Sequence, residues 1–130
     1  MNILLVEPDT VLARTYGAAL QAAGHTVQVR ATAQDAIFAA DERAPDIVVL
    51  ELQLVSHSGI EFLYEFRSYS EWQHIPVIIH SQVPATEFLR NQQQLRNELG
   101  VIEYLYKPQT TLVKLLKTVQ KVEPSTAALV

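Results

Sequence analysis

The chain has 130 residues, a size typical of a single domain, and 48% of them are hydrophobic, which is enough for one packed core. Its 14 acidic and 10 basic residues give a net charge of −4, which disfavours direct nucleic-acid binding because that function usually needs a basic surface. There is no cysteine, so disulfides and thiol chemistry are excluded. No basic segment precedes the first apolar residues and no apolar run is long enough to span a membrane, so we expect a cytoplasmic protein without membrane contact.

Short apolar segments alternate with amphipathic ones along the first part of the chain. Residues 3–6 are wholly apolar, as expected of a strand covered on both faces, and a helical spacing of apolar residues follows as far as Gly24. Residues 26–30 predict a strand nearer the edge of the sheet, because their apolar residues alternate with polar ones. Thr32 is placed to cap a second helix, which Pro45 ends.

The same alternation continues in the second part of the chain. Residues 47–50 are the most hydrophobic strand candidate, and Ser58 and Glu61 after them have the spacing of a helix capping box. Further strands are expected over 77–79 and 103–106. The helix between them is expected to end before Gly100, with one apolar stripe: Phe88, Gln92, Leu95 and Leu99. The last helix is expected to direct four residues inward: Leu112, Leu115, Leu116 and Val119.

Five strand–helix units predict an α/β fold with a doubly wound, five-stranded parallel sheet and helices on both faces. We expect one domain over residues 1–122 and a frayed tail over 123–130. In such folds the functional crevice lies beyond the carboxyl ends of the strands. The residues there are Glu7, Pro8 and Asp9 after the first strand, Glu51 after the third, Ser81 after the fourth, and Lys107 and Pro108 after the fifth.

These residue types share one chemical logic. Acids can hold Mg²⁺ through oxygen ligands, and a hydroxyl and an ammonium can hold the oxygens of a phosphoryl group. The constellation resembles the receiver domain of two-component response regulators, over residues 2 to about 121. The matching segments are 4–7, 45–50, Gly59, 76–81 and 104–108. The resemblance implies a flavodoxin-like fold with strand order 2-1-3-4-5, and a role in phosphorelay signal transduction rather than an enzyme.

The resemblance also implies roles for individual residues. Position 51 is that of the phospho-acceptor, which is aspartate in the family and Glu51 here. Glu7 matches the first acid of the metal-binding pair, but Pro8 replaces the second, and Asp9 lies one residue further along. Ser81 and Lys107 match the frame of the phosphoryl pocket, Pro108 matches a cis-proline beside that lysine, and Tyr104 matches the aromatic switch residue.

Two of these differences affect the chemistry directly. The additional methylene moves the Glu51 carboxylate by roughly 1.3–1.5 Å, a displacement that can cost about a hundredfold in an aligned reaction. Glu7 and Glu51 are the remaining metal ligands, and losing the acid at Pro8 weakens Mg²⁺ binding. We therefore expect an atypical pseudo-receiver that acts by protein–protein interaction, independently of phosphorylation.

Two interpretations of Glu51 remain open. Its longer carboxylate can reach Ser81 and Lys107 and imitate the phosphorylated aspartate, or it can pair with Lys107 and fill the pocket without favouring either state. One alternative function is a competent receiver that accepts a phosphoryl group from a histidine kinase, through Glu51 or Asp9. The other is a pocket that binds a small ligand or anion against Ser81 and Lys107.

The partner surface is suggested by an insertion. Positions 81 and 107 lie 26 residues apart, about one helical turn more than is usual in the family. In the family, the fourth helix, fifth strand and fifth helix often form the face for dimerisation or effector docking, so we expect a protein partner there: a kinase, an effector or a second copy. His57 and His80 are interpreted as ordinary loop and core residues, with His80 directed away from the Ser81 hydroxyl.

Overall fold

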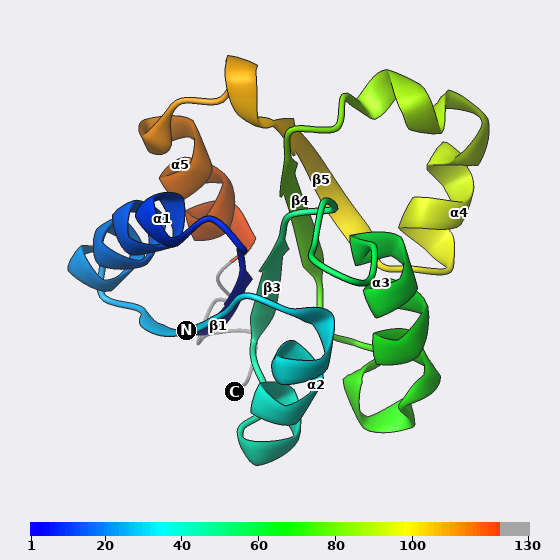
Figure 1. Ribbon diagram of the computed structural model, residues 1–130, viewed down its shortest axis with the longest axis horizontal. Helices are drawn as coiled ribbons and strands as arrows, with labels where there is room; N and C mark the ends of the chain where they lie inside the picture. Colours follow the sequence, from blue (N-terminus) through cyan, green and yellow to red (C-terminus); the bar gives the residue numbers. More distant parts are fainter. Residues whose placement is uncertain (123–130) are drawn as a thin grey trace.

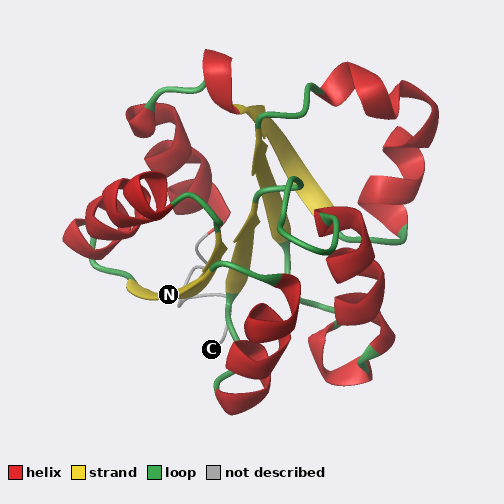
Figure 2. Cartoon of the chain, viewed as in Figure 1, coloured by secondary structure: helices red, strands yellow, loops and turns green. Residues whose placement is uncertain are grey.

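The computed structural model describes residues 1–122, so the tail predicted over 123–130 lies outside the described residues. Its five strands form one parallel sheet in the order β2-β1-β3-β4-β5, which confirms the predicted fold (Figures 1 and 2). The strands are β1 Asn2–Val6, β2 Thr26–Arg30, β3 Ile47–Leu50, β4 Val77–Ser81 and β5 Val101–Tyr106. The α-helices are α1 Thr10–Ala22, α2 Ala33–Glu42, α3 Gly59–Ser68, α4 Gln92–Asn97 and α5 Leu112–Val122. Short 3₁₀ helices span Ser70–Trp72, Ala85–Asn91 and Lys107–Gln109.

Helices cover both faces of the sheet because its inner strands are apolar on both sides. Helices α1 and α5 lie on one face, and α2, α3 and α4 on the other (Figure 1). In β1, Ile3 and Leu5 pack toward α1 and α5, while Leu4 and Val6 pack toward the opposite layer. The edge strand β2 is the least buried, as its alternating pattern predicted.

Side-chain caps fix the starts of the helices after β1, β2 and the loop after β3. Asp9 accepts a hydrogen bond from the amide of Leu12 at 3.0 Å and so opens α1. Thr32 and Ser58 cap α2 and α3 in the same way, as predicted. These caps set the helices close to the carboxyl ends of the strands, which is the edge that carries the predicted site.

The prediction of one continuous helix between Pro84 and Gly100 is wrong. A 3₁₀ stretch over Ala85–Asn91 comes first, with non-helical backbone angles at Phe88, and the α-helix runs only over Gln92–Asn97. The kink turns Phe88 against Tyr104, with ring centroids 5.9 Å apart, and the gain in aromatic packing accompanies the break in helical hydrogen bonding. The longer segment after Ser81 therefore arches over the end of the sheet before it reaches α4 (Figure 1).

Two smaller expectations also change. Leu112, predicted to face inward, is 38% exposed, because it lies in the first turn of α5 and burial in this helix begins at Leu115. The bond before Pro108, for which the resemblance implied a cis peptide, is trans, and Pro108 takes an early position in a 3₁₀ turn that suits its fixed φ angle. Within residues 1–122, no helix is both long enough and apolar enough to cross a membrane.

Candidate functional site

Four of the predicted site residues meet at the carboxyl edge of the sheet. Glu7 follows β1, Glu51 follows β3, Ser81 ends β4 and Lys107 follows β5. Because neighbouring parallel strands end side by side, these residues converge although 100 positions separate Glu7 from Lys107. We refer to Glu7, Glu51, Ser81 and Lys107 as the strand-end cluster.

Lys107 lies at the centre of this cluster. Its Nζ atom donates to Oε1 of Glu7 at 2.5 Å and to Oε1 of Glu51 at 2.7 Å. The three side chains are only 3–4% exposed, so both ion pairs are shielded from water. Burial lowers the pKa of Lys107, but the hydrogen bonds and charges of Glu51 and Glu7 outweigh it, and its pKa lies above the ordinary value. The ammonium is therefore charged at physiological pH.

The Glu51 carboxylate receives donors on both oxygens. Besides Lys107, Oε1 accepts from the amide of Gln82 at 3.1 Å. Oε2 accepts from the amide of Gln53 at 3.1 Å and from the Ser81 hydroxyl. Burial raises the pKa of Glu51, but these hydrogen bonds together outweigh it and lower that pKa below its ordinary value. Glu51 is thus a buried carboxylate whose charge is fully hydrogen-bonded.

Gly59 allows the backbone of the cluster to pack closely against α3. A Cβ atom at this position would lie 2.7 Å from Cα of Leu52 and 2.9 Å from the carbonyl oxygen of Glu51. The Gly59 amide also donates to the carbonyl oxygen of Leu52 at 2.8 Å. The glycine picked out from the sequence is therefore required by a close approach of two backbones directly behind Glu51.

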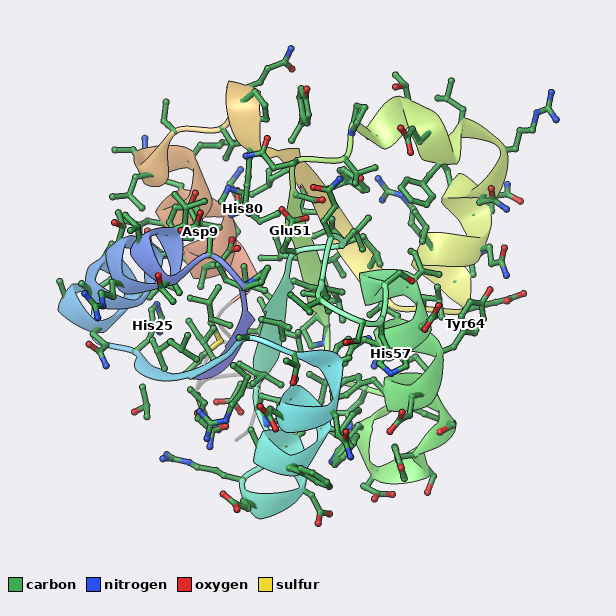
Figure 3. The ribbon with its side chains drawn as sticks, viewed as in Figure 1. Asp9, His25, Glu51, His57, Tyr64 and His80 are labelled. Atoms are coloured by element: carbon green, nitrogen blue, oxygen red, sulfur yellow. The ribbon has the colours of Figure 1, made fainter. Side chains whose placement is uncertain are left out.

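Asp9 and Pro8 do not join the strand-end cluster. The Asp9 side chain is exposed and caps α1, and Figure 3 shows it apart from Glu51. Only its backbone amide reaches the cluster, donating to Oε2 of Glu7 at 3.1 Å. Pro8 offers no side-chain ligand and lines a small hollow with Val29 and Ala31.

The cluster does not fit the magnesium ion that the resemblance implies. Within the part of the chain that the structure describes, no group of three or more acidic, histidine or cysteine side chains could hold a metal ion. The two remaining carboxylates, Glu7 and Glu51, both contact the ammonium of Lys107, which supplies the positive charge between them. Mg²⁺ binds through one or two carboxylates and several waters, and here both available carboxylates are already taken by the Lys107 ammonium at 2.5 and 2.7 Å.

Tyr104 lies at the margin of the core, close to the cluster. It is half-buried, and its hydroxyl donates to the carbonyl oxygen of Val83 at 2.6 Å. Burial and the negative charges of Glu51 and Glu87 raise its pKa above the ordinary value. The ring is thus held beside the segment that leaves Ser81.

His80 is directed to the opposite face of the sheet, as predicted from strand alternation. Its ring meets that of Tyr16 edge-on, with centroids 4.9 Å apart, and the residue is 3% exposed. Burial, together with the nearby charge of Lys107, lowers the pKa of His80 to about 4. His57 is exposed and pairs with Glu61 at 3.0 Å (Figure 3). Neither histidine contacts the cluster.

Three contributors to the site were not predicted from the sequence. The amides of Gln53 and Gln82 bind Glu51, but every residue except proline carries an amide, so no residue type could indicate them. Tyr16, which packs on His80 beneath the cluster, belongs to the apolar stripe of α1 and its spacing indicates only a core position.

Comparison with known proteins agrees with this geometry. The family described as "Response regulator receiver domain" matches residues 3–120, and the chain belongs to this family. It is similar to the KDP operon transcriptional regulatory protein KdpE of Escherichia coli, with 31% identity over 107 residues that cover 82% of this chain and 44% of that protein. It is also similar to the probable transcriptional regulatory protein TcrX of Mycobacterium tuberculosis, with 32% identity over 87 residues, or 67% of this chain and 36% of that protein. The chain thus spans less than half the length of these curated relatives.

Solved structures agree on the fold. The non-phosphorylated HemR receiver domain of Leptospira biflexa matches with a TM-score of 0.79 and 28% identity, covering 95% of each chain. The chemotaxis response regulator CheY4 of Vibrio cholerae matches with a TM-score of 0.80 and 24% identity over 93% of this chain and 97% of that one, which shows the shared fold alone.

Proposed function

We propose that this receiver domain acts without aspartyl phosphorylation, as a protein-interaction module whose phosphoryl pocket is filled by its own Glu51. The observation that supports this most directly is the set of donors around that carboxylate. The Ser81 hydroxyl and the Lys107 ammonium are the groups that would hold phosphoryl oxygens, and both bind Glu51 instead. The distance from Lys107 Nζ to Oε1 of Glu51 is 2.7 Å. The amide of Gln82 completes the set.

The length of the Glu51 side chain allows its carboxylate to reach these donors. Glu51 occupies the phospho-acceptor position, and its additional methylene carries the carboxylate toward Ser81 and Lys107. A carboxylate bears one charge where a phosphoryl group bears nearly two, so the imitation is partial. It is nevertheless permanent, because the charge belongs to the chain itself.

Tyr104 supports the active-like interpretation over simple filling of the pocket. In the family, the matching aromatic moves inward when a phosphoryl group draws in the hydroxyl at the position of Ser81. Here Ser81 already donates to Glu51, and Tyr104 is already half-buried and bonded to Val83. We interpret these two contacts as the arrangement that phosphorylation would otherwise induce.

The misfit with Mg²⁺ supports the same proposal. Phosphoryl transfer needs the metal to neutralise developing charge, and Pro8 has replaced one of its ligands. The ammonium of Lys107 lies between Glu7 and Glu51 and offsets one of their two negative charges. It occupies the position between the carboxylates at which a metal ion would have to bind.

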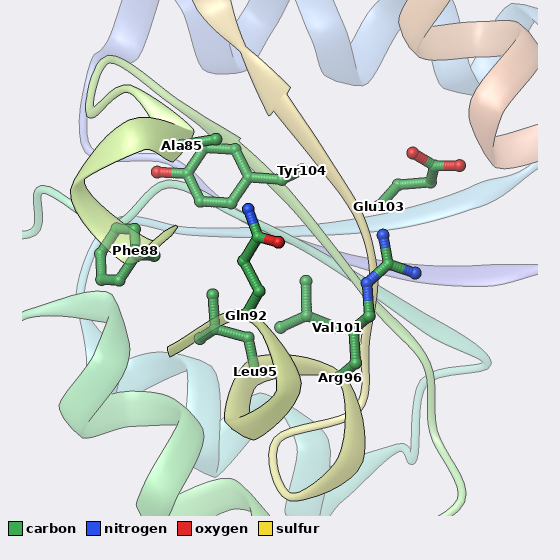
Figure 4. A pocket seen from close by; sticks show the side chains of 8 residues that line it. All are labelled: Ala85, Phe88, Gln92, Leu95, Arg96, Val101, Glu103 and Tyr104. Atoms are coloured by element: carbon green, nitrogen blue, oxygen red, sulfur yellow. The ribbon is translucent and has the colours of Figure 1, made fainter. Parts of the chain in front are cut away.

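We infer that the output is binding of a protein partner in the cytoplasm, through the face formed by α4, β5 and α5. This face carries a hollow of about 230 Å³ between the 3₁₀ stretch, α4 and β5 (Figure 4). Its lining is apolar at Phe88, Leu95 and Val101, with Arg96 and Glu103 among the polar residues. Tyr104 also lines it, and its hydroxyl binds the carbonyl oxygen of Val83, whose amide binds the Ser81 hydroxyl, so we expect changes in the strand-end cluster to affect the partner face.

The test is phosphorylation by a small donor. The purified protein is incubated with Mg²⁺ and acetyl phosphate and weighed by intact mass spectrometry, beside Glu51→Asp and the double variant Pro8→Asp/Glu51→Asp. We expect the wild type to stay unmodified and the double variant to gain a phosphoryl mass. Gain of that mass by the wild type would show a competent receiver, and mapping the site would separate Glu51 from Asp9.

A second measurement addresses ligand binding at the same pocket. If the strand-end cluster binds a small anion, a panel of anions will raise the melting temperature of the wild type more than that of Ser81→Ala. We expect no such difference, because Glu51 already occupies the donors of Ser81 and Lys107.

A further inference from the structure

We propose that a second copy of this chain docks its α5 helix into the groove between α2 and α3, so that the molecules associate head to tail. The groove has a volume of about 370 Å³. It is lined by Ala33, Gln34, Ile37, Phe38, His57, Glu61, Phe62, Glu65 and Tyr69. The proposal does not depend on the state of Glu51, which lies elsewhere.

The groove combines exposed aromatic surface with negative charge. Phe38 is 57% exposed and Tyr69 is 38% exposed, and both rings line this one groove. Two acidic side chains line it, Glu61 and Glu65, and Glu61 contacts the His57 ring at 3.0 Å. The other exposed charges of α2 and α3 are also acidic: Asp35, Asp41 and Glu42. The one basic residue of these helices, Arg67, turns inward and binds main-chain carbonyls. The groove therefore favours an occupant that is both basic and apolar.

Helix α5 has the complementary surface. It contains Lys114, Lys117 and Lys121 and no acidic residue, although the whole chain is acidic. Over residues 1–122, none of these lysines forms an ion pair within the molecule. Val113 on the same helix is 59% exposed. Among the residues that the structure describes, this basic and apolar helix face thus has no partner.

The two surfaces also match in spacing. Glu61, Glu65 and Tyr69 follow one another at intervals of four residues along α3 and its end, and all are exposed. Lys121, Lys117 and Val113 have the same interval along α5 in the opposite direction. Four residues of helix advance by about 6 Å, so an antiparallel alignment pairs both lysines with both glutamates. It also places Val113 against Tyr69.

One molecule cannot make this contact with itself. Helix α5 lies beside α1 on one face of the sheet, whereas α2 and α3 cover the other face (Figure 1). The contact joins unlike surfaces, so repeated contacts build a head-to-tail chain, which stays open unless its rotation closes a ring. Since α5 also belongs to the proposed partner face, a second copy and another partner would compete for it.

Sedimentation velocity tests the proposal on the full chain. We expect the wild-type mass to rise steadily from micromolar to millimolar concentration and to fall in high salt, which screens exposed ion pairs. Two charge-reversal variants, Glu61→Lys/Glu65→Lys and Lys117→Glu/Lys121→Glu, are each expected to weaken association by about tenfold or more, because two attractions become repulsions.

Pairs of variants make the test specific. The variants Phe38→Ser/Tyr69→Ser and Val113→Asp each remove one apolar half of the contact, and each keeps the other surface intact. In an equimolar mixture of these two variants, the groove variant supplies an intact α5 and the Val113→Asp variant supplies an intact groove. We therefore expect a 1:1 dimer and nothing larger. The matched charge control is Glu71→Lys/Glu98→Lys, which changes two exposed glutamates outside the groove and is expected to associate like the wild type.

Three results would overturn the proposal. The first is a wild type that stays monomeric at millimolar concentration. The second is association that stops at a dimer and is unaffected by the groove and α5 variants, which would indicate another interface. The third is a mixture that stays monomeric while circular dichroism shows both variants folded. Phosphorylation of the wild type would contradict the proposed function and leave this result unchanged.

Discussion

Two partly or fully buried cations stand at opposite ends of the sheet, and they are held in different ways. Lys107, at the carboxyl ends of the strands, is bound by the carboxylates of Glu7 and Glu51. Arg67, at the end of α3, donates only to main-chain carbonyl oxygens, those of Leu99, Trp72 and Ile75. The carboxylate partners of Lys107 are side chains, which a substitution removes. The partners of Arg67 are main-chain carbonyl oxygens, which every residue at those positions provides. The contrast indicates that Arg67 fixes the fold and Lys107 defines the pocket.

The electrostatic consequences differ as well. Burial disfavours the charge of both residues. At Arg67 burial lowers the pKa below its ordinary value, while at Lys107 the hydrogen bonds and charges of Glu51 and Glu7 outweigh burial and raise the pKa above its ordinary value. Only the Lys107 end of the molecule therefore contains partners that titrate.

The largest expected effect comes from removing the shared cation of the strand-end cluster. Lys107→Met leaves two buried carboxylates without their counter-charge, and we expect the free energy of unfolding to fall by about 3–5 kcal/mol. Urea denaturation measures it. The triple variant Glu7→Gln/Glu51→Gln/Lys107→Met should recover a large part of the loss, and a triple variant no more stable than the single one would contradict this account.

The matching change at the other end is Arg67→Met. Three carbonyl oxygens lose their donor, and we expect a loss of about 2–3 kcal/mol in the free energy of unfolding. Arg67→Lys should restore only part of it, because one ammonium cannot reach three carbonyls as a planar guanidinium does. Full recovery by lysine in urea denaturation would show that the charge matters more than the fork geometry.

Acid should affect the Lys107 end first. The pKa of His80 in the folded protein, about 4, lies below its ordinary value of 6.5, so the unfolded chain binds the extra proton and stability falls as pH drops through this window. We expect a slope of up to about 1.4 kcal/mol per pH unit between these values. The lowered pKa of Glu51 adds a further loss at lower pH still, as that carboxylate becomes protonated.

The variant His80→Gln separates these contributions. It should flatten the dependence of unfolding free energy on pH between about 6.5 and 4, while Arg67→Met should leave the slope unchanged. Denaturation at a series of pH values measures both, and an unchanged slope in His80→Gln would assign the effect to other groups.

The smallest expected effect is that of Ser81→Ala. The hydroxyl donates to Glu51 and accepts from the amide of Val83 at 3.0 Å, but Lys107 and two amides still hold Glu51 in its absence. We expect a loss of about 1 kcal/mol in urea denaturation. A loss as large as that of Lys107→Met would show that the hydroxyl, and not the ammonium, organises the pocket.

The sheet and the convergence of the cluster could be predicted because both follow from patterns in the sequence. Apolar runs fix the strands, and the carboxyl ends of parallel strands share an edge, so Glu7, Glu51, Ser81 and Lys107 had to approach one another. The caps Thr32 and Ser58 were predictable for the same reason, since their side chains act within one turn.

The remaining features depend on packing between distant segments. The kink at Phe88 follows from its contact with Tyr104, and no local propensity indicates it. Asp9 turns outward because its carboxylate caps α1, which keeps it away from the other acids predicted at the strand ends. The inward turn of Arg67 depends on carbonyl oxygens that only the fold brings together.

The hydrogen bonds of Glu51 have a kinetic consequence. A phosphoryl group that is attached and removed has a rate of attachment and a lifetime. A domain that carries it can therefore be switched on and off while the number of molecules stays constant. Glu51 is tethered by the chain to the donors it binds, so its local concentration at the pocket cannot be diluted away. Under the proposed function, a signal encoded in that way has no decay time of its own, and its strength follows the number of molecules that the cell makes and removes.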